Sequence, residues 1–111
     1  MAKRKRRSLS AYGRSPVGRQ NINMYYVYVL KCNNGDLYIG YSDDLRKRVR
    51  DHQLGKVRST KSKRPIELVY YEAYKNKKDA TKREYELKTG QQRELLKKRL
   101  TYSVGNGAVV K

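Results

Sequence analysis

Two short runs of strand-type residues flank an Asn-Gly pair early in the chain. The runs cover residues 26–30 and 37–40, and a polar turn occupies residues 33–36. Alternation of apolar and polar side chains is typical of strands with one buried face, and an Asn-Gly between two such runs indicates a β-hairpin. The pattern therefore predicts a hairpin over about residues 24–41.

Two registers fit this hairpin. A two-residue turn pairs Tyr28 with Tyr41, whereas a three-residue loop with Gly35 in the left-handed conformation pairs Tyr28 with Gly40. We favour the second register because it sorts the side chains by polarity. One face is then apolar (Val27, Val29, Leu37 and Ile39). The other face carries three phenols and a glycine that a ligand could approach (Tyr26, Tyr28, Tyr38 and Gly40).

A helix is predicted to follow the hairpin, with Ser42 or Asp43 as its N-cap and Gly55 as its stop. Arg48 and His52 lie four residues apart, so they share one face of this helix. Its apolar side runs beside them (Leu45 and Val49).

Residues 55–65 form a basic loop without an acidic residue. It contacts nucleic-acid phosphates or is simply a mobile basic surface, and the sequence leaves both interpretations open. Its basic residues are Lys56, Arg58, Lys61, Lys63 and Arg64.

The β-prone run 66–74 predicts a third strand, in which strict alternation puts Leu68 and Tyr70 on the face opposite Tyr71. A helix capped by Asn76 follows. Glu84 shares its apolar stripe (Ala80 and Leu87). A half-buried carboxylate there is either paired with a Lys or Arg or is a metal ligand.

A third helix is predicted over residues 91–100, with Leu95, Leu96 and Leu100 as its apolar side. Residues 101–111 contain two glycines and no period, so we expect a loose tail. A short edge strand there (Val104, Val109 and Val110) is the alternative. At the other end, residues 1–23 lack acidic residues, and we interpret them as a disordered basic arm.

Charge indicates the kind of partner. The chain has 111 residues with 28 Lys and Arg against 10 Asp and Glu, a net charge of +18. Such an excess favours a polyanion, nucleic acid before an anionic membrane, because the basic residues are spread along the chain. The single Cys32 excludes an intrachain disulfide and the single His52 excludes a multi-histidine metal site. With no long apolar run and no signal peptide visible, we expect a cytoplasmic protein without a membrane partner.

The residues of the hairpin and its following helix resemble the GIY-YIG nuclease motif. Tyr26-Val27-Tyr28 is followed ten residues on by Tyr38-Ile39-Gly40, and Tyr26 replaces the first glycine of the motif. As in that family, an arginine (Arg48) lies ten positions after the second tyrosine. A histidine (His52) lies four positions after that arginine. The later helix also matches the family pattern (Ala80, Glu84, Leu87 and Lys88). The resemblance covers about residues 24–100 and is closest to the small single-domain UPF0213 branch; a late asparagine common in the family has no matching position.

The resemblance implies an α+β fold, a three-stranded antiparallel sheet with its first strand central and three flanking helices. It also implies a metal-dependent endonuclease that hydrolyses DNA phosphodiesters, with little sequence specificity and a role in DNA repair or recombination. The catalytic residues it implies are Tyr28, Tyr38, Arg48, His52 and Glu84.

In that scheme Glu84 holds one Mg²⁺ or Mn²⁺ and Arg48 neutralises phosphate charge. The general base stays open between Tyr28, Tyr38 and His52. Nucleic-acid contacts are expected at Gly40 and in the basic loop. The rival interpretations are a non-catalytic module that binds DNA or RNA and a small ribosome- or RNA-associated protein.

Overall fold

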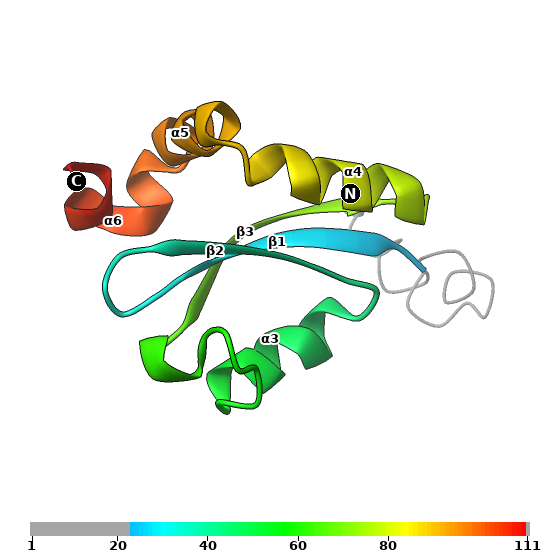
Figure 1. Ribbon diagram of the computed structural model, residues 1–111, viewed down its shortest axis with the longest axis horizontal. Helices are drawn as coiled ribbons and strands as arrows, with labels where there is room; N and C mark the ends of the chain where they lie inside the picture. The colour runs from blue at the N-terminus through cyan, green and yellow to red at the C-terminus, as the bar shows by residue number, and fades with distance from the viewer. Residues whose placement is uncertain (1–22, 111) are drawn as a thin grey trace, which may run out of the picture.

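A three-stranded antiparallel sheet forms the centre of the protein. The computed structural model describes residues 23–110, and side chains as far as residue 105. The strands are β1 (Tyr25–Lys31), β2 (Leu37–Ser42) and β3 (Glu67–Tyr74), in the order β2-β1-β3. The predicted α+β architecture with its first strand central is therefore confirmed (Figure 1).

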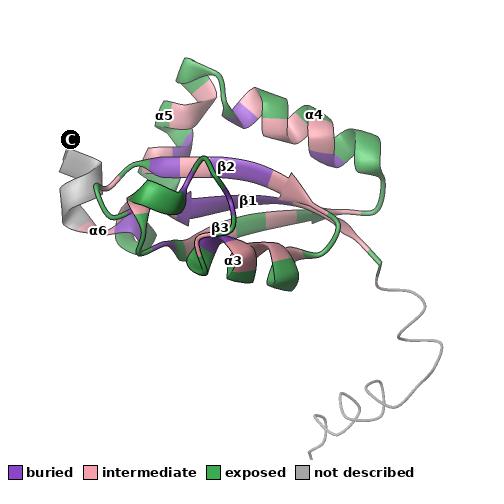
Figure 2. Cartoon of the chain, turned by 60° about the horizontal axis from the view of Figure 1, so that its bottom comes forward, coloured by how far each residue is buried: buried purple, intermediate pink, exposed green. Residues whose placement is uncertain are grey.

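Helices cover both faces of the sheet (Figure 1). Three of them, α4 (Lys77–Leu87), α5 (Gly90–Arg99) and α6 (Thr101–Val110), lie on one face. The other face carries α3 (Leu45–Gln53) and a 3-10 helix (Lys61–Lys63). Strand β1 lies between the two layers and is the most buried element (Figure 2). Among the described residues, no helix has the length and apolar character needed to cross a membrane.

The hairpin adopts the favoured register. Tyr28 pairs with Gly40 and Leu30 with Tyr38. Gly35 has a φ of 88°, and its N–H donates to the carbonyl of Cys32 over 3.0 Å. The apolar side chains of both strands then pack under α4–α6 (Val27, Val29, Leu37 and Ile39).

Strand β3 departs from strict alternation. Val29 pairs with Tyr70 while its neighbour Leu30 pairs with Leu68, so Val69 is an extra residue in β3. Leu68 therefore packs on the α3 face and Tyr70 packs on the α4–α6 face with Val69. The predicted alternation of β3 was wrong because a bulge shifts every side chain on one side of it to the opposite face.

The chain after residue 100 is helical, where a loose tail or edge strand was expected. Val104 is buried with Leu96 and Leu100. These residues are spaced four apart, so the apolar stripe of α5 continues into α6. The helix is interrupted at Gly105, which has φ 83° and ψ 167°. Of the arm predicted for residues 1–23, all but residue 23 lies outside the described residues.

Two helix details also differ from the predictions. Asp44, not Ser42 or Asp43, caps α3, because its carboxylate accepts from the N–H of Lys47 over 3.2 Å. Leu95 is 51% exposed rather than part of the apolar side of α5. Asn76 caps α4 as predicted.

An internal polar cluster attaches α4 to β3. The carboxylate of Glu72 accepts from Arg83 on α4 over 2.9 Å and from the hydroxyls of Tyr70 and Tyr74. Burial on its own would raise the pKa of Glu72, but the hydrogen bonds from Arg83 and the two tyrosines outweigh it and lower that pKa. The ionised carboxylate therefore holds α4 in a fixed place on the sheet.

Gly40→Ala tests the close contact between the two hairpin strands. A Cβ at Gly40 would overlap the hydroxyl end of Tyr28, whose ring is buried and unable to move aside. We expect the free energy of unfolding to fall by about 1–3 kcal/mol. Urea unfolding followed by circular dichroism measures it.

Gly90→Ala is the matched control. It lies at the start of α5, where a Cβ would meet nothing within 4 Å. Its stability should be unchanged or higher by up to ~1 kcal/mol. Equal stability of the two variants would contradict the expected overlap at Gly40.

Candidate active site

A buried chain of hydrogen bonds joins three elements of the α3 face. The Tyr28 hydroxyl on β1 lies 2.9 Å from His52 Nε2 on α3. His52 Nδ1 in turn lies 2.7 Å from the hydroxyl of Thr60, in the loop after α3. All three side chains are at most 1% exposed. Because each polar atom has a partner, the chain is compatible with full burial.

Burial keeps Tyr28 and His52 uncharged. Loss of hydration and the nearby Arg48 cation lower the pKa of His52 to about 4. Burial also raises the pKa of Tyr28, although the Arg48 side chain acts against this shift. At neutral pH the pair is therefore an uncharged phenol and an uncharged imidazole.

Tyr38 extends this group to the surface. Its ring centroid lies 5.1 Å from that of His52 and 6.5 Å from that of Tyr28. Unlike Tyr28, Tyr38 is partly exposed, on edge strand β2. Of the two motif tyrosines, Tyr38 is thus the one that solvent can reach.

Arg48 lies next to these aromatic rings. Its interaction with the Tyr28 hydroxyl raises the pKa of the guanidinium above its already high value, with smaller contributions from Tyr38 and Asp51. The cation is therefore permanent, and it is partly exposed. A guanidinium so placed can bind an anion at the edge of the aromatic group.

Glu84 approaches from α4. Its side chain is 23% exposed and forms an ion pair with Lys88 Nζ over 3.0 Å. The pKa of the Tyr28 hydroxyl is raised mainly by burial, and the negative charge of Glu84 adds a small contribution in the same direction. Glu84 is therefore near the site, but it is bound to Lys88 and not to the catalytic candidates of the α3 face.

A groove of about 250 Å³ runs beside Tyr38 and carries cations from three elements. We call it the cationic groove; Lys63, Lys88 and Arg93 line it together with Tyr38, and Asp36 is the one acidic residue in its lining. Arg93 is held in place because it donates to the carbonyl of Leu37 over 2.6 Å. Such a convergence of cations fits a phosphate-bearing chain.

Comparison with known proteins decides the family. Residues 24–99 match the model of the GIY-YIG catalytic domain. The chain belongs to the GIY-YIG family. The match covers the hairpin, α3, the basic loop, β3, α4 and α5, so the elements that build the site are those of a family of nucleases.

Similar proteins of known sequence carry the name UPF0213. A UPF0213 protein of Staphylococcus epidermidis is 48% identical over 77 residues, which cover 68% of this chain and 94% of the relative. One from Staphylococcus saprophyticus is 43% identical over the same shares. The solution NMR structure of the UPF0213 protein BH0048 from Bacillus halodurans is 31% identical, with a TM-score of 0.47, and the match covers 79% of this chain and 94% of that one.

The glycine of the GIY-YIG motif has a structural role here. Gly40 is buried, and the ring of Tyr28 fills the space above it. The expectation that nucleic acid approaches Gly40 is therefore wrong, because the cross-strand tyrosine occupies that space. The glycine permits Tyr28 to lie flat across β2 and reach His52.

The basic loop is tied to the hairpin turn. Asn33 donates from its side chain to the carbonyl of Arg64 over 2.8 Å, and its N–H donates to Lys63. The Arg64 guanidinium folds back over Gly55 and donates to the carbonyl of Lys61. Of the five predicted phosphate contacts, the structure puts Lys63 in the cationic groove; the others are exposed elsewhere on the loop (Lys56, Arg58, Lys61 and Arg64).

Two residues of the site escaped the sequence analysis. Thr60 stood among serines and lysines of a loop, with no pattern to mark it as a partner of His52. Arg93 was one basic residue of a polar helix start. Their roles depend on contacts with residues far away in the sequence, so no local signal could have revealed them.

His52 allows a direct test of the buried chain. As the only histidine, it gives one set of imidazole NMR signals. In the folded protein we expect a titration midpoint at about 4. In urea the midpoint should return to ~6.5. A folded midpoint near ~6.5 would contradict burial of the imidazole.

The same shift sets the direction of a stability change with pH. Because the unfolded state takes up the proton first, the contribution of His52 is complete above ~6.5 and is lost as pH falls toward 4, by up to about 3 kcal/mol. His52→Gln should flatten the dependence of unfolding free energy on pH in that window.

Proposed function

We propose that this protein is a divalent-metal-dependent endonuclease that hydrolyses phosphodiester bonds in DNA. The observation that carries the proposal is that Tyr28, His52 and Arg48 gather around Tyr38, which itself lines the cationic groove. A merely basic protein has no need of a partly exposed phenol beside a fixed guanidinium. Phosphodiester hydrolysis requires both a group that handles the proton of water and fixed positive charge.

Tyr38 is the general base in this proposal. It is partly exposed at the groove, so an attacking water can lie beside its oxygen, which takes the proton in the phenolate form. Tyr28 is 1% exposed and cannot meet a substrate directly. With His52 it holds the ring of Tyr38 from behind, and both remain positioning residues.

Arg48 and the cationic groove bind the phosphate charge. The guanidinium of Arg48 donates to the non-bridging oxygens, where charge increases during the attack. Lys63 and Arg93 hold the neighbouring phosphates of the chain. These contacts carry no base information, so we propose cleavage with little sequence preference.

Glu84 fits a single hydrated metal ion. Within the described residues, no three His, Cys, Asp or Glu side chains gather into a closed metal site. A lone carboxylate completed by water and phosphate is an arrangement that Mg²⁺ or Mn²⁺ accepts. Lys88 is 51% exposed and can leave Glu84 for a phosphate in the groove. When bound, the ion would supply Lewis-acid catalysis.

The alternative is a nucleic-acid-binding module without catalytic activity. The Glu84–Lys88 ion pair favours it, because a carboxylate already paired needs no metal. The net charge of +18 would provide its affinity. The Glu84 test below separates the two proposals.

Glu84→Gln should abolish nicking of supercoiled plasmid in Mg²⁺ while binding of the plasmid is retained. We expect a loss of at least ~100-fold, because the amide cannot hold the cation. The matched control is Glu94→Gln, which likewise breaks an ion pair with a lysine, on α5 away from the groove, and should cut like the wild type.

Two outcomes would count against the nuclease proposal. Full activity of Glu84→Gln would remove Glu84 from the site. Salt-sensitive binding without metal-dependent cutting by the wild type, on plasmid and on branched DNA, would support the binding module.

Lys63→Gln tests the phosphate path. The logarithm of the binding constant falls linearly with the logarithm of salt concentration, with a slope that reports the number of phosphates neutralised. We expect the slope to decrease by about one unit for this variant. Lys82→Gln, exposed on α4 outside the groove, should leave the slope as it is. An unchanged slope in both variants would exclude Lys63 from the path.

A further inference from the structure

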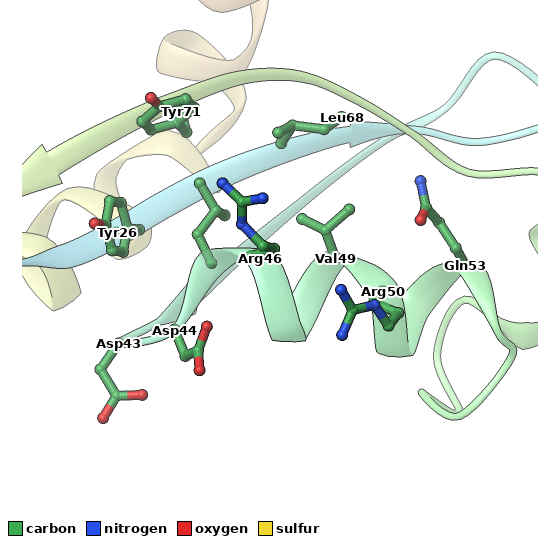
Figure 3. A pocket seen from close by; sticks show the side chains of 10 residues that line it. Tyr26, Asp43, Asp44, Arg46, Val49, Arg50, Gln53, Leu68 and Tyr71 are labelled. Carbon is green, nitrogen blue, oxygen red and sulfur yellow. The ribbon is translucent and has the colours of Figure 1, made fainter. Parts of the chain in front are cut away.

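A second groove lies between α3 and β3, and none of the candidate catalytic side chains lines it. Its volume is about 620 Å³, and Figure 3 shows it from close by. We call it the aromatic groove. Its lining comprises Tyr26, Asp43, Asp44, Leu45, Arg46, Val49, Arg50, Gln53, Leu68 and Tyr71. It is therefore distinct from the cationic groove beside Tyr38.

The sheet side of the aromatic groove is an aromatic wall. The rings of Tyr26 and Tyr71 meet edge to face, with centroids 6.0 Å apart, and Tyr71 is 51% exposed. The bulge in β3 makes this wall, because it brings Leu68 and Tyr71 to the face that Tyr26 occupies. Leu45 and Val49 of α3 add apolar surface opposite.

The helix side carries groups that bind anions and base edges. Arg46 and Arg50 are exposed, and Figure 3 shows the side chain of Arg46 directed from α3 toward the sheet. Gln53 offers an amide at the other end of the helix. Asp43 and Asp44 also line the groove, at the N-terminal end of α3, where Asp44 caps the helix. The two cations Arg46 and Arg50 lie farther along α3, so a phosphate would bind on that part of the groove.

We propose that the aromatic groove binds an unpaired nucleotide. A base can stack against Tyr71 or Tyr26 while Arg46 or Arg50 binds its phosphate, a combination typical of single-strand binding surfaces. The bases of an intact duplex already stack on one another, so their faces are not available to the tyrosines. A ligand with exposed bases and phosphates fits both walls of the groove.

Such a site would select DNA or RNA with a single-stranded stretch. The inference shares a nucleic-acid partner with the proposed function, but it does not depend on cleavage. A substrate that combines a duplex with a single strand could occupy both grooves, since they lie on the same protein and carry separate sets of residues.

Nitration of tyrosine by tetranitromethane, read by mass spectrometry, tests the groove in the full-length protein. EDTA is present throughout, so a failure of cleavage does not affect the result. The probes are an oligothymidylate and a duplex of equal length. Tyr85 and Tyr102, 75% and 97% exposed and outside the groove, serve as internal references.

We expect Tyr71 to be nitrated in the free protein and protected by the single strand, with the reference tyrosines unchanged. Equal protection by the duplex, or no protection by either probe, would overturn the proposal. So would a Tyr71 that is unreactive in the free protein, because another part of the chain would then fill the groove.

Affinity gives a second measurement. Tyr71→Ala should weaken binding of the oligothymidylate by roughly five- to a hundredfold, the range expected for loss of one stacked base. Tyr71→Phe keeps the ring and should keep the affinity, and Tyr85→Ala is the exposed control. Equal affinities for Tyr71→Ala and Tyr85→Ala would overturn the stacking role.

Discussion

The hydrogen bond between the Tyr28 hydroxyl and His52 is the contact on which the α3 face depends. It joins residues 24 positions apart in a place that water does not reach. An unpaired hydroxyl or imidazole there would cost about 1–3 kcal/mol. Thr60 completes the arrangement by occupying the second ring nitrogen, so strand β1, helix α3 and the basic loop are fixed relative to one another.

This bond also explains the residues around it. Gly40 lacks a side chain because the ring of Tyr28 crosses it on the way to His52. Tyr38 packs against the same imidazole and is carried to the surface by edge strand β2. A rigid neutral pair therefore supports one accessible phenol beside the Arg48 cation. Catalytic groups work best when their supports are packed and hydrogen-bonded in this way.

Charge on the opposite side of β2 is more balanced. Glu84 and Lys88 neutralise each other beside the cationic groove, whose lining also holds Lys63, Arg93 and the acidic Asp36. The pair is only partly buried, so its stability contribution is small and a phosphate or a cation can compete for either partner. Glu72 shows the contrasting case, since Arg83 and two tyrosines hold its carboxylate in place.

The sequence by itself determined the hairpin, because alternation of side chains and the conformational freedom of Gly35 act between near neighbours. It also determined the Asn76 cap and the family pattern of tyrosines, arginine, histidine and glutamate. Only the tertiary structure decided that His52 is buried against Thr60, that a bulge at Val69 builds the aromatic groove, and that α6 continues the core. These outcomes depend on contacts between distant residues and on the filling of shared space, which no local pattern records.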